Sequence, residues 1–161
     1  MRSKIKMSES VFFLSGYKYR LRETLWAQTR LRPKHEIARG NVILTREGLL
    51  IVLPRYSSDG PSGPTIDIKS FMPGAFIHDA GYELLAHDMF NDVPVRIMDS
   101  QLGLLLEDAT HEKIRAEFDK MLYDINKQNG MFDFVNWLIL KAVTLFGRSS
   151  ATKPRKIHKA P

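Results

Sequence analysis

Cysteine is absent from this chain of 161 residues, and its absence excludes disulfides, zinc sites built on thiolates and thiol nucleophiles. Long apolar runs are also missing. The longest, FVNWLILKAVTLF, is interrupted by Asn136 and Lys141 and is too short to span a bilayer. Near the N-terminus the apolar run covers only residues 11–14, so we expect neither a signal peptide nor a transmembrane helix. We therefore expect a soluble protein.

Acidic residues are scarce at both ends of the chain. Residues 1–39 contain ten Lys and Arg against three Glu, and residues 148–161 contain five Lys and Arg and no acid. The formal net charge of +6 comes from these ends, because residues 40–147 hold nine basic and fifteen acidic side chains, a balance of −6. We interpret residues 148–161 as a flexible basic tail after a single domain, residues 1–147. The tail could contact nucleic acid or simply keep the protein soluble.

The apolar pattern predicts strands first and helices later. In NVILTREGLLIVLP, two β-rich runs flank a turn whose Gly48 can take a positive φ, which predicts a hairpin. Helical spacing follows Pro73 and Gly74 as far as residue 86, and Asp99 resembles the N-cap of a short helix over residues 99–108. The strongest helix covers residues 110–129, and a last one, 132–146, is ended by Gly147 and should lie against the sheet. This order predicts an α+β domain with a mostly antiparallel N-terminal sheet, packed by about three C-terminal helices.

The stretch SSDGPSGPTIDIKSFMPGAFIHDAGYELL carries the candidate chemistry, because a loop rich in glycine and proline precedes an adjacent His-Asp pair. One hypothesis is a divalent-metal site with Asp59, His78 and Asp119 as ligands, although the spacing matches no standard metal motif. Another makes His78 a general base oriented by Asp79, with Asp59 as a charged partner and Ser62 or Ser58 as a nucleophile. Ser62 lacks the G-x-S-x-G setting of a nucleophile elbow.

A purely structural role explains the same residues. Asp59 could form a turn with the neighbouring backbone, and Asp79 could interact with the positive end of its own helix. His78 would then be a core histidine that fixes the loop onto the helix. The residue pattern leaves the metal, catalytic and structural interpretations open.

Four segments, in order along residues 40–147, carry a family resemblance: SDGPSGP, GAFIHDAGYELL, RAEFDKMLYDINKQNG and WLILKAVTLFG. Together they resemble a small phage and prophage family of unknown function, with a Thr/Ser-Asp-Gly-Ala-Ser-x-Pro loop, a His-Asp helix and a later Asp-bearing helix. The resemblance implies that Asp59, Ser62, His78, Asp79 and Asp119 are signature positions, with Arg115 beside the last. Pro61 stands where the family has alanine, which alters the turn beside Ser62.

The resemblance implies a phage or prophage origin but no reaction, and together with the residue pattern it leaves two functions open. One is a phage accessory enzyme, a hydrolase with a carboxylate-histidine site and a divalent metal ion as candidate cofactor, acting on cell wall or another polymer. SGYKYR and IDI are faintly similar to peptidoglycan metallopeptidases, whose two-histidine ligand pattern is missing here. The other is a non-catalytic virion or interaction protein whose basic N-terminal strand and tail contact nucleic acid or other subunits. Either implies the host cytoplasm or the phage particle as the location.

Overall fold

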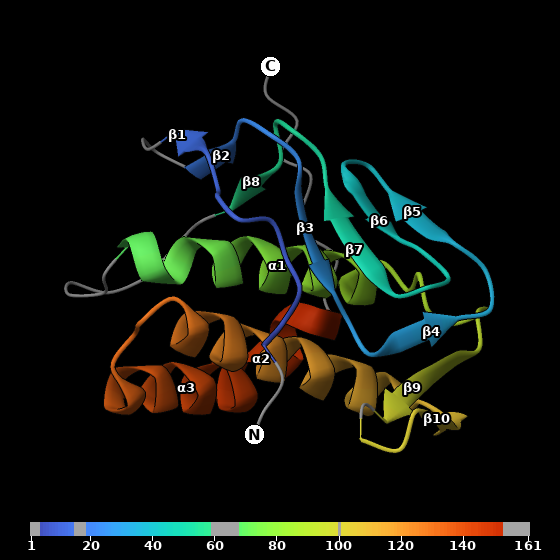
Figure 1. The fold of residues 1–161 in the computed structure, drawn as a ribbon. Helices are drawn as coiled ribbons and strands as arrows, with labels where there is room; N and C mark the ends of the chain where they lie inside the picture. The colour runs from blue at the N-terminus through green and yellow to red at the C-terminus, as the bar shows by residue number, and fades with distance from the viewer. Residues whose placement is uncertain (1–3, 15–18, 59–67, 100, 153–161) are drawn as a thin grey trace.

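The fold, taken from a computed structural model, is described for residues 4–14, 19–58, 68–99 and 101–152 (Figure 1). In the described residues up to 58 the regular elements are short strands, and helices dominate the C-terminal half. The elements are β1 (Phe13–Leu14), β2 (Tyr19–Leu21), β3 (Leu25–Gln28), β4 (Leu31–Pro33), β5 (Ile37–Arg39), β6 (Val42–Leu44), β7 (Leu49–Val52), β8 (Ser57–Ser58), α1 (Ile68–Ala86), β9 (Val95–Asp99), β10 (Leu104–Asp108), α2 (His111–Gln128) and α3 (Asp133–Thr152).

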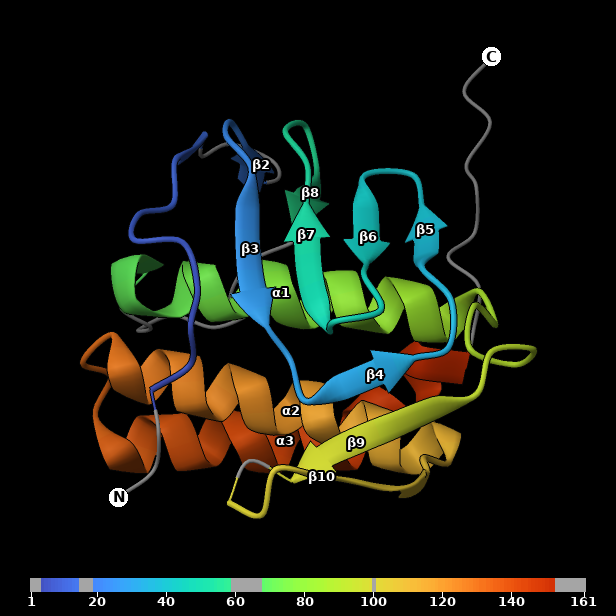
Figure 2. The same cartoon turned by 45° about the vertical axis from the view of Figure 1, so that its right-hand side comes forward.

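Every strand pair is antiparallel. The largest sheet has the order β3-β7-β6-β5, and two three-stranded sheets have the orders β10-β9-β4 and β1-β2-β8 (Figure 2). The predicted hairpin is β6–β7, in which Leu44 faces Leu50 across the turn. Gly48 takes a φ of 82° there, as the turn requires. With three helices in the C-terminal half, the predicted α+β single domain is confirmed.

The three helices of the described residues pack on one another, and α1 is the helix with the main contacts to the strands. Helix α1 contacts β7 and β8, α2 packs against α1, and α3 packs against both α1 and α2. The apolar stripe of α2 is buried in full: Ile114, Phe118, Met121, Leu122 and Ile125. Thr110 caps this helix by accepting a hydrogen bond from the Lys113 amide at 3.3 Å.

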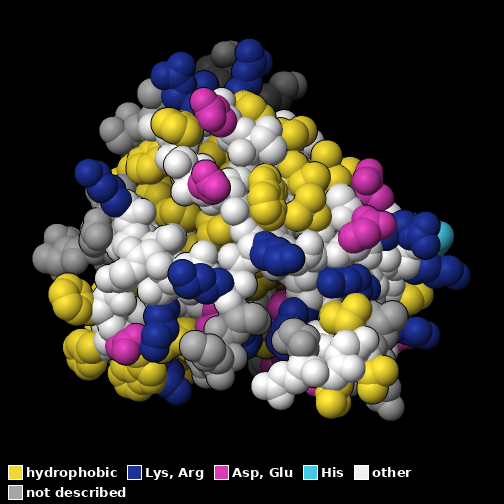
Figure 3. Space-filling model, in the orientation of Figure 1, with side chains coloured by type: hydrophobic (Ala, Val, Ile, Leu, Met, Phe, Trp, Pro, Cys, Tyr) yellow, Lys and Arg dark blue, Asp and Glu magenta, His cyan; other side chains and the backbone are white. Residues whose placement is uncertain are grey.

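The prediction that the last helix lies against the sheet was wrong, because its main neighbours are α1 and α2. It is apolar on two sides, and only one side can meet those helices. The other side leaves Phe134, Trp137, Leu138 and Leu145 exposed. Hydrophobic side chains gather over the end of the molecule where α2 connects to α3, at the lower left of Figure 3.

The short helix predicted over residues 99–108 is instead the hairpin β9–β10, in which Leu104 pairs with Asp99. Asp99 does accept hydrogen bonds from the amides of Gln101 and Leu102, as an N-cap would. Gly103, however, takes a φ of 64° and the chain reverses. The cap-like aspartate therefore stabilises a turn, and the leucine-rich run becomes a strand.

Both ends of the helical region also differ from the prediction. Helix α1 begins at Ile68 and runs through Pro73, because Phe71 and Met72 become buried in the core. Burying two large apolar side chains stabilises by several kcal/mol, which offsets the roughly 3 kcal/mol that an interior proline costs. Helix α3 continues past Gly147 to Thr152, so the predicted tail begins within a helix, and residues 153–161 lie outside the described part.

No helix in the described ranges is both long and apolar enough to cross a membrane.

Close contact between α1 and α2 depends on Gly81. A Cβ at this position would lie 2.4 Å from ring atoms of Phe118, which is fully buried in α2. Such a distance is far below van der Waals contact, so any side chain here would push the two helices apart.

We expect Gly81→Ala to lower the free energy of unfolding by about 1–3 kcal/mol, as overpacking of a core does. Chemical denaturation of the wild type, Gly81→Ala, Phe118→Leu and the double variant provides the measurement. Because leucine vacates the ring position, the double variant should lose less stability than the sum of the single variants. A more stable Gly81→Ala protein, as helix propensity alone predicts, would contradict this packing.

Candidate functional site

The centre of the candidate site is a contact between two buried side chains, His78 of α1 and Asp119 of α2. Their Nε2 and Oδ1 atoms are 2.9 Å apart. The two residues are 41 positions apart in the sequence, and the packing of α1 against α2 brings them together. The structure thus places two of the predicted site residues in direct contact.

Asp119 is the acceptor for two further donors. The Tyr82 hydroxyl donates to Oδ1 at 2.6 Å, and the Arg115 guanidinium donates to Oδ2 at 3.2 Å. Arg115 also reaches the Thr144 carbonyl of α3 at 3.5 Å, so the network joins all three helices. The buried carboxylate of Asp119 is thus in contact with three polar side chains.

The other side of His78 faces Asp79. Nδ1 of His78 lies 3.8 Å from Oδ1 of Asp79, an ion-pair distance longer than a hydrogen bond. Ser58 of β8 donates its hydroxyl to Oδ2 of Asp79 at 2.6 Å. The Asp79 side chain is 27% exposed, whereas that of Asp119 is 4% exposed. The network therefore runs from a buried carboxylate, through the imidazole, to a carboxylate that solvent reaches.

Burial and hydrogen bonding act on the protonation of this site in different ways. Burial lowers the pKa of His78, whereas its contacts with Asp119 and Asp79 raise it, and the net direction is upward from the ordinary 6.5. Burial and the hydrogen bond to Asp119 both raise the pKa of Tyr82, so the phenol stays protonated at neutral pH. The imidazolium form of His78 is thus the favoured partner of the two carboxylates.

The remaining predicted residues, Asp59 and Ser62, lie outside the described residues, so their contacts with His78 stay a prediction. Within the described ranges, no group of three or more His, Asp or Glu side chains could hold a metal ion. Asp119 is engaged with the imidazole, the phenol and the guanidinium. Its position thus favours a role in orienting His78 over one as a metal ligand.

Two features of this region have no clear signal in the sequence. An aromatic residue one turn after His78 is an ordinary core pattern, so the contact of Tyr82 with Asp119 cannot be told from packing. A second buried carboxylate on α2, Glu117, accepts hydrogen bonds from Arg30, at 3.0 Å from Nε and 2.5 Å from Nη2. This pair fixes the turn between β3 and β4 to α2.

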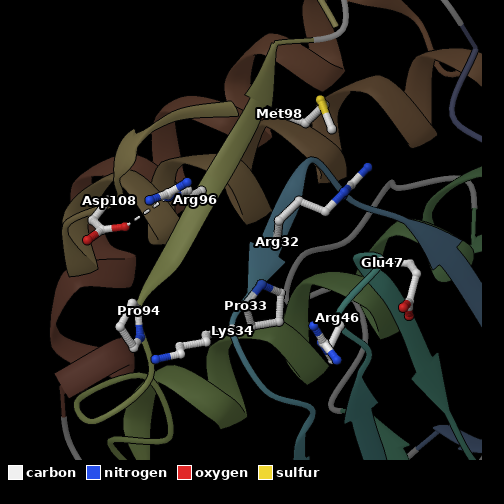
Figure 4. Close-up of a pocket in the computed structure, with 9 residues that line it drawn as sticks. All are labelled: Arg32, Pro33, Lys34, Arg46, Glu47, Pro94, Arg96, Met98 and Asp108. Carbon is white, nitrogen blue, oxygen red and sulfur yellow. Dashed lines mark ion pairs between the residues drawn. The ribbon is translucent and has the colours of Figure 1, made fainter. Parts of the chain in front are cut away.

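A separate pocket of about 620 Å³ lies between β4, β9 and the turn that joins β6 to β7 (Figure 4). It is lined by Arg32, Pro33, Lys34, Arg46, Glu47, Pro94, Arg96, Met98 and Asp108. Four of these side chains are cationic and two are anionic. Arg96 lies 3.5 Å from Asp108, and both side chains are largely exposed. The pocket is therefore cationic overall and open to solvent.

The raised pKa of His78 predicts how stability depends on pH. A folded-state pKa above the unfolded value contributes stability that is complete below pH 6.5 and is lost as the pH rises through the folded-state pKa. The free energy of unfolding of the wild type minus that of His78→Asn should therefore fall as the pH rises above about 6.5. Chemical denaturation at each pH measures this difference.

His87→Asn is the matched control for this experiment, because His87 belongs to a second His-Asp pair with no described contact to the network. It shows how much of the pH dependence comes from replacing a histidine outside the network. If the difference for His78→Asn instead grew with pH, His78 would be held neutral, and the ion-pair description of the site would be wrong.

Comparison with known proteins adds no relative to this chain. A scan of family models, a search of curated proteins and a search of solved structures each give no match. Any function must therefore be inferred from the residues and geometry of the chain itself.

Proposed function

We propose that this protein is a bacteriophage or prophage accessory protein with an acid–base site at His78, and that it hydrolyses cell wall or another polymer. The observation that carries the proposal is the place of His78 between a buried carboxylate and a partly exposed one. Acid–base catalysis needs a group of this kind, whose proton is held in position and whose pKa is tuned by its neighbours.

The buried end of the network sets the tautomer of the imidazole. Asp119 already accepts from Tyr82 and Arg115, so its contact with Nε2 of His78 favours a proton on that nitrogen. Nδ1, on the side of Asp79, is then the nitrogen that gains and loses a proton. In hydrolysis, the imidazolium of His78 would give its Nδ1 proton to the leaving group, and the resulting neutral imidazole would take a proton from the attacking water.

The exposed end of the network would meet the substrate. Asp79 is held by the Ser58 hydroxyl, and Asp59 and Ser62 come soon after Ser58 in the sequence. A metal-dependent form of the proposal uses Nδ1 of His78 and Asp79 as ligands, with Asp59 as the third. Asp119 would then orient the ligating imidazole, as carboxylates commonly do behind metal-bound histidines.

Hydrolysis is tested by the release of soluble fragments from purified peptidoglycan by the wild type, His78→Ala and Asp79→Asn. Both variants should lose about 100-fold or more in rate, the size of a typical acid–base contribution. His87→Ala is the matched control and should keep full activity. Metal analysis of the wild type, His78→Ala and Asp59→Asn tests the metal-dependent form, in which both variants lose the ion.

Asp79→Asn separates an effect on catalysis from an effect on folding. The Asp79 side chain is partly exposed, so losing its charge should leave the thermal midpoint nearly unchanged. A wild type that releases no fragments and holds no metal, together with variants that lose only stability, would refute the enzyme and leave a structural network.

A second candidate function is suggested by the cationic pocket: a non-catalytic virion or interaction protein that contacts nucleic acid. Lys34 and Arg46 face the pocket from different elements, and Arg32 is fixed there by hydrogen bonds to the Thr29 and Leu31 carbonyls at 2.9 and 2.8 Å. Cations held on a rigid surface attract phosphate without reading sequence. The basic tail predicted from the sequence would add to this attraction.

For this candidate we expect the affinity for DNA to fall steeply with salt concentration. In Lys34→Ala and in Arg46→Ala, the slope of log K against log salt concentration should be smaller by about one, because each variant removes one cation. Filter binding over a salt series measures it. Glu47→Gln is the control of opposite sign and should strengthen retention. Retention unchanged by all three variants and by removal of residues 153–161 would eliminate this function.

A further inference from the structure

Helix α3 carries a continuous apolar face that the fold does not cover. Its inner side packs on the core through Val135, Ile139 and Val143, with Asn136 and Gly147 buried. Facing away from these residues, the exposed fractions are 70% for Phe134, 47% for Trp137, 46% for Leu138 and 71% for Leu145. A surface helix normally places polar side chains outward, whereas α3 is apolar on its outer side as well as on its inner side.

The exposed residues form one stripe. Positions 134, 137, 138, 141 and 145 have the spacing i, i+3, i+4, i+7 and i+11, which lies on a single side of a helix. Phe134 and Trp137 stack with ring centroids 6.4 Å apart, and the Lys141 ammonium lies 5.7 Å from the Trp137 ring. The stripe is thus aromatic at one end and aliphatic at the other, with one cation in it.

After Asp133, the first residue of α3, all charged residues along and after this helix are basic. Residues 134–161 contain six basic side chains, Lys141, Arg148, Lys153, Arg155, Lys156 and Lys159, and no Asp or Glu. Exposed apolar groups combined with a cationic segment are the two signals that together hold a protein on an anionic membrane. Tryptophan is favoured at the membrane–water interface, and a lysine beside it can extend its ammonium toward the lipid phosphates.

The other occupants of such a face fit less well. In an antiparallel copy of α3, Lys141, near the middle of the stripe, would meet the Lys141 of the second copy without a carboxylate between them. Nucleic acid would satisfy the cations but would leave Phe134 and Leu145 without apolar contacts. A lipid surface accommodates both the apolar stripe and the positive charge.

We propose that α3 docks this protein on the surface of a membrane rich in anionic lipid, with Phe134, Trp137, Leu138 and Leu145 in the headgroup and upper acyl region. The helix lies along the membrane, because its inner face remains packed on α1 and α2. Docking involves neither His78 nor the cationic pocket, so it stands apart from both proposed functions.

Trp137 and Trp26 are the two tryptophans of the chain, which makes fluorescence a direct test. The full chain is mixed with phosphatidylcholine vesicles, with or without phosphatidylserine. With phosphatidylserine we expect a blue shift and quenching by brominated lipid, both kept in Trp26→Phe and both lost in Trp137→Phe. Trp26 is the matched control, since it is 36% exposed on the four-stranded sheet.

Co-sedimentation with the same vesicles measures the affinity. Leu138→Gln with Leu145→Gln should weaken binding about tenfold or more, and both sites are exposed, so circular dichroism should show an unchanged fold. High salt should weaken binding of the wild type. DNA retention by the double variant should equal that of the wild type, which separates the lipid face from the cationic pocket.

Three results would overturn the proposal. The first is no sedimentation with phosphatidylserine vesicles, and the second is sedimentation that the double variant retains in full. The third is a dimer in light scattering that Leu138→Gln with Leu145→Gln converts to a monomer, which would assign the face to a second copy of the chain.

Discussion

The carboxylate of Asp119 is the group on which the helical half of this protein depends. It is buried, and it accepts hydrogen bonds from His78 and Tyr82 of α1 and from Arg115 of its own helix. Removing one partner from a buried charge leaves the other charges uncompensated, at a cost of roughly 3–5 kcal/mol. The relative placement of α1 and α2 is therefore fixed by charge as well as by apolar packing.

This network can form only because the helices approach closely. Gly147 of α3 lies against Tyr82, and a Cβ on it would be 2.5 Å from the phenol oxygen. A side chain there would move the hydroxyl that donates to Asp119. The glycine that resembles a helix terminator in the sequence is thus an interior contact residue. Its missing side chain lets α3 cover the network, and Arg115 reaches the Thr144 carbonyl of the same helix.

Local patterns predicted the elements that depend on local interactions. The β6–β7 hairpin is indicated by two β-rich runs and Gly48, and α2 by the helical spacing of residues 110–129. The predictions failed where contacts between residues far apart in the sequence determine the secondary structure. Leu104 joins a strand because β9 offers a partner, and α1 starts early because Phe71 and Met72 find a core to enter.

In the candidate site, too, contacts between distant residues could not be predicted from local patterns. That His78 meets Asp119 was expected from a family resemblance in the order of segments, and no spacing rule links residues 41 positions apart. Tyr82 could not be assigned, since an aromatic at helical spacing looks the same whether it packs or donates a hydrogen bond. The pairing of Arg30 with Glu117 across the domain has no sequence signal at all.

The two carboxylates at the ends of the network have different roles. Substitution of Asp119, the end that holds three donors and joins the helices, would disturb fold and chemistry together. Asp79, the solvent-facing end, is held only by Ser58 among its described hydrogen bonds, so chemistry can be altered there while the helices stay in place. The inner face of α3 packs on this same network, and its outer face is the apolar stripe. A surface bound to that stripe would therefore lie on the opposite side of α3 from its contacts with Tyr82 and Arg115.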